Sequence, residues 1–184
     1  LQRGAELFGW SARNPQPRSR RDGEWWIGHG VAAAFRNHID KKSAARVRLT
    51  RDGDLVVETD MTDIGTGSYT IIAQTAAECL GLPLHRVSVR LGDSDFPVSC
   101  GSGGQFGAAN STSGVYAACM KLRAAIAQRL GVTENDVEFA NGSVRAGGKT
   151  FAIRDAARDG ELTAEDVIEF GDLGKTYQQS TFGA

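Results

Sequence analysis

The sequence lacks both a long apolar run and an excess of charge of one sign. No stretch of about 20 apolar residues occurs, which is the length that a membrane-spanning helix needs. No basic segment followed by an apolar stretch opens the chain, so no signal peptide is visible. The 21 lysines and arginines nearly balance 22 aspartates and glutamates, and the net charge is −1. This balance gives no electrostatic reason to expect a nucleic acid or an anionic membrane as a partner.

Cysteine and histidine are scarce, with three residues of each. The widely spaced Cys79, Cys100 and Cys119 form no Cys-x-x-Cys pair and no Cys/His grouping that would hold zinc or an iron–sulfur cluster. Because free cysteine is among the most buried residue types, we expect these three to pack as small hydrophobic residues. The histidines lie far apart and are expected to be surface or hydrogen-bonded residues rather than metal ligands: His29, His38 and His85.

The usual catalytic groupings are missing as well. Ser102 and Ser111 have no neighbouring histidine, so nothing supports a serine nucleophile. Asp93 and Asp95 follow the end of an expected strand, where carboxylates can act in catalysis, but aspartate is also ordinary turn chemistry and we favour the turn. The sequence therefore yields no catalytic and no metal-binding residue.

Glycine, in contrast, is abundant, with 23 residues where average usage predicts about 13. Two clusters, at 65–67 and 101–107, fall at the N-terminal ends of two expected helices. Backbone without Cβ can approach a ligand closely, and the N–H groups at a helix start favour phosphate or another anion. Neither cluster matches the GxxxxGK[ST] or GxGxxG signature. The spacing alone leaves open whether the clusters hold a ligand or only turn and cap the chain.

The order of the expected elements predicts an α+β fold, that is, a mixed α/β arrangement of one mixed sheet with two main helices. A composition of 41% hydrophobic and 23% charged residues is that of a globular domain. Residues 46–59 and 137–152 read as β-hairpins around Asp-Gly and Asn-Gly turns, and residues 86–91 read as a further strand. Apolar residues at helical spacing predict helices near 68–80 and 109–130, which we expect on one side of the sheet.

The ends of the chain are less regular. Residues 1–24 carry two prolines and several arginines with little apolar periodicity, and are expected to form an irregular lead-in that lies on another surface, ahead of a domain at 25–184. Residues 153–160 favour a short helix, residues 162–170 are ambiguous, and residues 175–184 are strand-like without a partner in the sequence.

Two stretches carry a resemblance to a known family. Residues 59–67, followed by Gln74, resemble that family's Gly-Gln-Gly segment and its downstream glutamine. Residues 87–93, 102–105 and 114–119 resemble its second cofactor segment and the helix that follows. With these segments in the same order and spacing, the chain resembles the molybdenum-cofactor-binding subunit of the xanthine dehydrogenase and aldehyde oxidase family. The resemblance implies that the sequence is part of a molybdopterin-binding domain.

The flanking residues 4–10 and 28–32 resemble the bacterial branch of that family, in which a separate molybdenum subunit belongs to a periplasmic aldehyde oxidoreductase. This implies molybdopterin cytosine dinucleotide as the cofactor, with FAD and [2Fe–2S] clusters on partner subunits. The implied activity is an oxidoreductase that hydroxylates an aldehyde or N-heterocycle with oxygen from water. The compartment stays open between periplasm and cytoplasm, because a partner subunit can carry the export signal.

Seven residues correspond by position to the cofactor-binding segments of the family. The first segment would line one side of the pterin dinucleotide and the second would bind its phosphates and pterin; the residues are Gly65, Thr66, Gly67, Ser102, Gly103, Gly104 and Gln105. Thr66 departs from the family, which commonly has glutamine there, so only a hydroxyl or backbone contact can replace the amide.

The resemblance also implies what the chain does not hold. The glutamate that serves the family as general base lies downstream of the matched segments, and an earlier glycine-rich segment lies upstream. We therefore expect a fragment that is inactive and free of molybdenum when isolated, with the dithiolene of the pterin rather than protein side chains holding the metal. The alternative reading is a non-catalytic α/β binding module whose glycine loops contact some other nucleotide.

Overall fold

The computed structural model describes residues 1–37, 39–133, 137–171 and 180–183. The chain divides into two compact units, Leu1–Asn37 with Ser180–Ala184, and His38–Gln179. Among the described residues, every buried side chain belongs to the larger unit, which also holds both glycine clusters. The core that positions the candidate site therefore lies within this larger unit.

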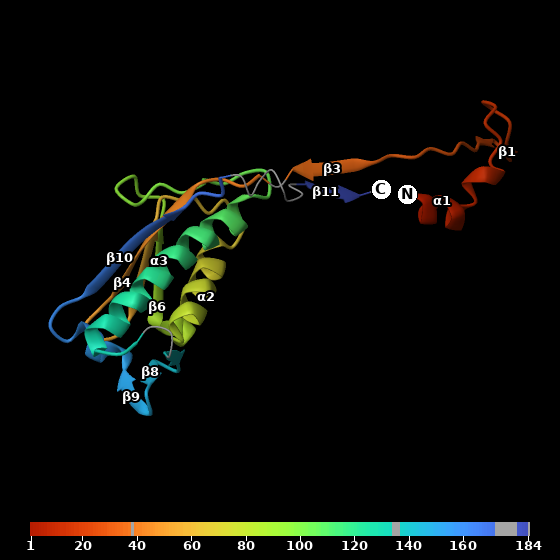
Figure 1. Ribbon diagram of the computed structural model, residues 1–184. Helices are drawn as coiled ribbons and strands as arrows, with labels where there is room; N and C mark the ends of the chain where they lie inside the picture. Colours follow the sequence, from red (N-terminus) through yellow and green to blue (C-terminus); the bar gives the residue numbers. More distant parts are fainter. Residues whose placement is uncertain (38, 134–136, 172–179, 184) are drawn as a thin grey trace. The chain divides into compact units, whose positions relative to one another are not determined.

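A four-stranded mixed sheet forms the centre of the larger unit (Figure 1). Its strands in spatial order are Leu162–Ile168 (β10), Ser43–Leu49 (β4), Leu55–Thr59 (β5) and Val87–Leu91 (β6). β4 pairs antiparallel with β10 and β5, whereas β5 and β6 are parallel. This confirms the mixed sheet and the hairpin at 46–59. The ambiguous residues 162–170 contain an edge strand, whose alternate residues Leu162 and Ala164 are buried on the side that packs against α3.

Both long helices cover one face of this sheet, as predicted (Figure 1). They are Ser68–Leu80 (α2), which connects the parallel strands β5 and β6, and Gly107–Leu130 (α3). Each buries one stripe and ends at a glycine in the left-handed region, Gly81 or Gly131. The buried stripes consist of Ile72, Ala76 and Leu80 on α2, and Val115, Cys119, Leu122 and Ile126 on α3. No helix in the described part of the chain is long and apolar enough to cross a membrane.

A small antiparallel meander closes one end of the unit. Its strands are Glu138–Ala140 (β7), Ser143–Ala146 (β8) and Lys149–Ala152 (β9), followed by a short 3-10 helix, Ile153–Ala157 (η4). Asn141 and Gly142 turn between the first two strands with φ of 51° and 72°, which is the conformation that an Asn-Gly hairpin turn requires. The hairpin prediction at 137–152 is confirmed, and a further 3-10 turn, Leu84–Arg86 (η2), precedes β6.

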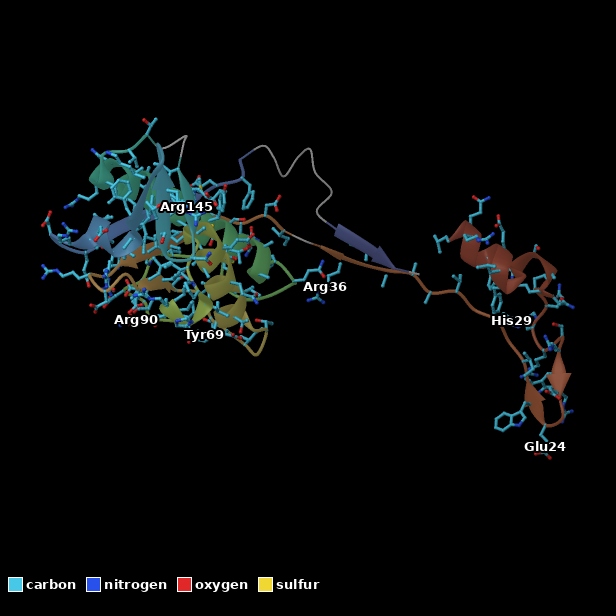
Figure 2. All side chains as sticks on the ribbon, turned by 90° about the horizontal axis from the view of Figure 1, so that it is seen from below. Glu24, His29, Arg36, Tyr69, Arg90 and Arg145 are labelled. Carbon is cyan, nitrogen blue, oxygen red and sulfur yellow. The ribbon has the colours of Figure 1, made fainter. Side chains whose placement is uncertain are left out.

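The opposite face of the sheet carries charged side chains rather than helices. Glu58 of β5 is 7% exposed and lies among Arg46, Arg48 and Arg90, with N–O distances of 3.6, 4.0 and 3.4 Å. Arg90 lies at the exposed surface of the larger unit (Figure 2). The helix-covered face carries the hydrophobic core, which fixes the register of the strands.

The smaller unit corrects two expectations. Residues 1–24 are not irregular throughout, because Gln2–Phe8 (α1) and Trp10–Ala12 (η1) are helical, and Arg21–Asp22 (β1) pairs with Trp25–Trp26 (β2). Helix α1 has only 7 residues and none of them is buried, so it is too short for helical periodicity to be recognised in the sequence. The final strand, Ser180–Gly183 (β11), does have a partner, since it pairs antiparallel with Ala34–Asn37 (β3). Residues 175–179 of the strand-like end lie outside the described residues.

Candidate functional site

The two glycine clusters follow β5 and β6, and the parallel pairing of these strands places both strand ends at the same edge of the sheet. Three hydrogen bonds join the segments that lead into the clusters. The Asp60 N–H donates to the carbonyl of Pro97 over 3.0 Å, the Ser99 N–H donates to the Asp60 carboxylate over 2.5 Å, and the Ser102 hydroxyl donates to the carbonyl of Thr62. This agrees with the expected proximity of the two loops.

In the first loop, a carboxylate that the sequence reading missed binds the backbone. Asp63 Oδ1 accepts hydrogen bonds from the N–H groups of Gly65 and Thr66 over 2.8 and 2.9 Å, and Oδ2 accepts from that of Tyr69 over 3.4 Å. Tyr69 lies in the first turn of α2, with its side chain at the surface (Figure 2). An aspartate two residues before a glycine is a known turn signal that could have identified this role. Asp63 thus occupies the anion position at the start of α2, and a ligand would contact this loop through its side chains and open glycine surface.

The protonation of Asp63 should control the order of the first loop. Burial by itself would raise the pKa of this carboxyl, but backbone hydrogen bonds from Gly65, Tyr69, Thr66 and Ser68 outweigh it and lower the pKa below the ordinary value. A pKa that is lower in the folded chain than in the unfolded one, where it is about 3.9, stabilises the fold fully above that value. The stabilisation is lost as the pH falls through the folded pKa. We expect the amide-exchange protection of Gly65, Thr66 and Tyr69 to decline as the pH falls from about 3.9 through the lower, folded pKa of Asp63.

An Asp63→Ala variant should show weak protection of these three amides at every pH, while Asp63→Asn should retain part of it because its amide oxygen still accepts a hydrogen bond. Asp93→Ala is the matched control, since Asp93 also accepts a local backbone hydrogen bond, from Asp95 over 3.0 Å, but lies in another turn. Unchanged exchange in Asp63→Ala would contradict this account of the loop.

The second loop is held in a conformation that favours glycine. Gly101 and Gly104 have φ of 70° and 38°, and Gln105 has φ of 60°, a left-handed conformation uncommon for a residue with a Cβ. A Cβ at Gly103 or Gly104 would lie 3.3 Å from the ring of Phe106. Phe106 is the N-cap of α3, and no side-chain hydrogen bond from it caps the described helix. The loop therefore leads directly into a helix start suited to an anion.

A positive charge and a buried amide also lie beside the second loop. The ammonium of Lys41 lies 4.5 Å from the centre of the Phe106 ring. Asn110, which is 1% exposed, accepts a hydrogen bond from the Lys41 N–H over 2.8 Å and donates to the carbonyls of Ile39 and Phe106 over 2.9 and 2.7 Å. An asparagine inside a helix is unfavourable enough to suggest a specific hydrogen-bonding role from the sequence alone. Its partners Lys41 and Ile39, however, lie 69 and 71 residues away and could not be inferred.

The remaining sequence candidates have structural roles. Asp93 and Asp95 share a turn, and the Ser111 hydroxyl donates to the carbonyl of Ala108 over 3.2 Å within α3. His29 and His85 are exposed, as expected, whereas His38 lies outside the described residues. All three cysteines are free. Cys119 is buried as expected, while Cys79, in the last turn of α2, and Cys100, in the loop between β6 and α3, are only half-buried.

Comparison with known families shows to which family the chain that carries these loops belongs. The molybdopterin cofactor-binding domain family matches residues 3–184 of the chain. The chain belongs to this family.

Relatives of this molybdopterin cofactor-binding domain occur in Escherichia coli (strain K12). The chain is 60% identical over 182 residues to the aldehyde oxidoreductase molybdenum-binding subunit PaoC, a match that covers 99% of this chain and 25% of that protein. It is 32% identical over 183 residues to the probable hypoxanthine oxidase XdhD, covering 95% of this chain and 18% of that protein. The chain thus spans at most about a quarter of the length of these curated relatives.

A solved structure has the same fold. The Cu,Mo-CO dehydrogenase, in its carbon monoxide reduced state, superposes with a TM-score of 0.63 and 18% identity over 82% of this chain and 22% of that one. At this identity the likeness concerns the fold alone, and it agrees with the α+β architecture of the larger unit.

The loops of this molybdopterin cofactor-binding domain fit a large polar ligand. A Cβ built at Gly65, Gly67 or Gly101 meets no described atom within 4 Å, so the backbone there faces open space. Lys41 adds a positive charge beside the second loop. Among the described residues, no group of three or more His, Cys, Asp or Glu side chains could hold a metal ion. The expectation that side chains of this chain do not hold molybdenum stays a prediction.

Proposed function

We propose that this chain is part of the molybdenum-binding subunit of an oxidoreductase that oxidises aldehydes or N-heterocycles with oxygen from water. The observation that carries the proposal is the 60% identity to the aldehyde oxidoreductase molybdenum-binding subunit PaoC over nearly all of the chain. An aldehyde is favoured over a purine as the substrate class, since identity to the probable hypoxanthine oxidase XdhD is only 32%.

The role of this chain in that subunit is to bind the pterin dinucleotide, in its cytosine form, between the two glycine loops. When bound, the cofactor supplies two-electron redox chemistry at molybdenum. Ser102, Gly103, Gly104 and Gln105 contact phosphate and pterin at the start of α3, where helix N–H groups favour an anion. Gly65, Thr66 and Gly67 line the other side, and the hydroxyl of Thr66 takes the place of the family's glutamine amide.

The residues that hold the two glycine loops in place support this proposed role for each loop. Asp63 orders the first loop by accepting backbone hydrogen bonds, and Asn110 fixes Lys41 beside the second. The hydrogen bond from Ser102 to Thr62 links the loops directly. A preorganised pair of loops loses less conformational entropy when a ligand binds.

The remaining parts of the enzyme lie outside this chain in our proposal. A general-base glutamate comes from another segment of the subunit, and FAD and [2Fe–2S] clusters belong to partner subunits. The bacterial complex is placed in the periplasm or the cytoplasm. A nucleic acid and a membrane are not among the proposed partners.

The 184-residue chain alone should retain no molybdenum and show no aldehyde-dependent dye reduction, while the intact subunit does both. Two loops enclose only part of a dinucleotide, and affinity depends on burial from several sides. Metal analysis by mass spectrometry and a dye-reduction assay on both preparations provide the measurement. Stoichiometric molybdenum or turnover in the isolated chain would contradict the proposed division of the site. An intact subunit without molybdenum would contradict the proposed function itself.

A further inference from the structure

Two free cysteines meet between the long helices, outside the candidate cofactor site. Cys79 lies in the last turn of α2 and Cys119 near the middle of α3, and the two helices pack against each other. Their thiols form a side-chain hydrogen bond. Cys119 is fully buried in the core, whereas Cys79 is half-buried at the edge of the same cluster. One sulfur of the pair is thus accessible and the other lies directly behind it.

The accessible sulfur faces a surface hollow. This hollow has a volume of about 490 Å³ and lies between the helices; its lining is Thr75, Glu78, Cys79, Tyr116, Met120 and Arg123. The guanidinium of Arg123 donates a hydrogen bond to the carbonyl of Cys79 over 2.5 Å and stacks 4.0 Å from the ring centre of Phe139. These two contacts hold a positive charge beside the sulfur. Reactive cysteines are typical of such partly exposed, electropositive surroundings.

The charges around the pair favour ionisation of Cys79 rather than Cys119. The hydrogen bond from Cys119 and the charge of Arg123 lower the pKa of the Cys79 thiol, against the opposing effects of burial and of Glu78. The hydrogen bond to Cys79 and burial raise the pKa of Cys119 well above its ordinary value. Because Cys79 is the more accessible of the two and has the guanidinium of Arg123 beside it, we assign the nucleophile to Cys79 and place Cys119 behind it in the core.

We propose that Cys79 is a peroxide-reactive thiol and Cys119 its resolving partner, so that oxidation by hydrogen peroxide links α2 to α3 through a disulfide. The Cys79 thiolate attacks one peroxide oxygen, an S–O bond forms, the O–O bond breaks, and hydroxide leaves. The sulfur of Cys119 then attacks Cys79, an S–S bond forms, the S–O bond breaks, and the departing hydroxide takes the Cys119 proton as water. Two thiols are oxidised to a disulfide while one peroxide is reduced to two waters.

Cys100 is an internal comparison for this proposal. It is also half-buried, but its sulfur donates to the carbonyls of Gly101 and Gly107 over 3.2 and 3.6 Å, and burial raises the pKa of its thiol. At similar exposure, the raised pKa leaves Cys100 a smaller thiolate fraction than Cys79 and should make it slow to react.

The experiment treats the intact protein with iodoacetamide at neutral pH, and in parallel with hydrogen peroxide before alkylation, and locates the products by mass spectrometry. A digest that cuts after Phe106 or Tyr116 separates Cys100 from Cys119. Cys79 should be alkylated about tenfold faster than Cys100, in line with its larger thiolate fraction. Peroxide should produce a cross-linked peptide pair containing Cys79 and Cys119, which a reductant removes.

Variants separate the roles of the two sulfurs. Cys119→Ala should leave Cys79 able to form a sulfenic acid, trapped by dimedone, without the cross-link, while Cys79→Ser should abolish both products. Cys100→Ser is the matched control and should give the same cross-link as the unmodified sequence. Should Cys119→Ala fail to fold, the alkylation rates of the unmodified protein still decide the matter. Equal alkylation of Cys79 and Cys100, or peroxide oxidation without a Cys79–Cys119 cross-link, would overturn the proposal.

Discussion

Replacing Gly114 with alanine should lower the free energy of unfolding of the larger unit by about 3 kcal/mol, the upper part of the range for overpacking a close contact. Gly114 lies where α3 crosses β4, and a Cβ there would be 2.7 Å from the carbonyl oxygen of Ser43 and 2.9 Å from its carbon. Both neighbours are backbone atoms of a central strand, so the helix itself must move. The gain in helix propensity from glycine to alanine, about 1 kcal/mol, is too small to compensate.

The displacement should also reach the second loop. The Ser43 hydroxyl lies 2.7 Å from that of Ser99, which belongs to the segment that leads into residues 101–107. Urea unfolding followed by circular dichroism gives the change in stability, and amide exchange at Ser99 reports on the loop.

Gly107→Ala is the matched control on the same helix. A Cβ there would come within 3.0 Å of Met61 Cε, the far end of a flexible side chain that can give way. We expect this variant to keep its stability to within about 1 kcal/mol, because the helix-propensity gain of that size offsets the small shift. A Gly114→Ala protein as stable as Gly107→Ala would show that α3 and β4 are not in the close contact described here.

A single negative charge in the second loop should remove most of the bound cofactor from the intact subunit. In Gly104→Asp the carboxylate would lie where we propose that the dinucleotide phosphates bind, and repulsion between charges near a protein surface is worth about 1 to 4 kcal/mol. This corresponds to a loss of affinity of roughly fivefold to several hundredfold. Any side chain at Gly104 is strained by the φ of 38° and by the ring of Phe106, 3.3 Å from a Cβ, so the effect of the charge has to be measured against a neutral side chain at the same position.

Gly104→Asn is the control that isolates charge, since asparagine has the same shape and the same tolerance for this backbone conformation. Molybdenum content and aldehyde oxidation, measured on both variants at equal protein concentration and low salt, should separate them clearly. Raised ionic strength should reduce the difference through screening. Equal cofactor content in the two variants would place the phosphates away from this loop.

The sequence by itself determined the main elements of the larger unit, because these depend on local rules. Alternating residues and an Asp-Gly turn are sufficient for the hairpin at 46–59, and an apolar stripe closed by Gly131 is sufficient for α3. The glycine clusters and their family resemblance also lie in contiguous residues. In contrast, α1 was not predicted, because a helix of 7 residues is shorter than the stretch over which helical periodicity can be recognised.

Only the tertiary structure decided which residues distant in sequence share the candidate site and the helix interface. Asp63 accepts hydrogen bonds from backbone N–H groups of the first loop, and Asn110 hydrogen-bonds the backbone of residues 39 and 41. Cys79 of α2 interacts with Cys119 of α3. Likewise, the partner of β11 and the edge position of β10 follow from pairing across more than one hundred residues. Local propensity carries no information about such pairings, because they depend on which surfaces remain to be covered once the helices have packed on the sheet.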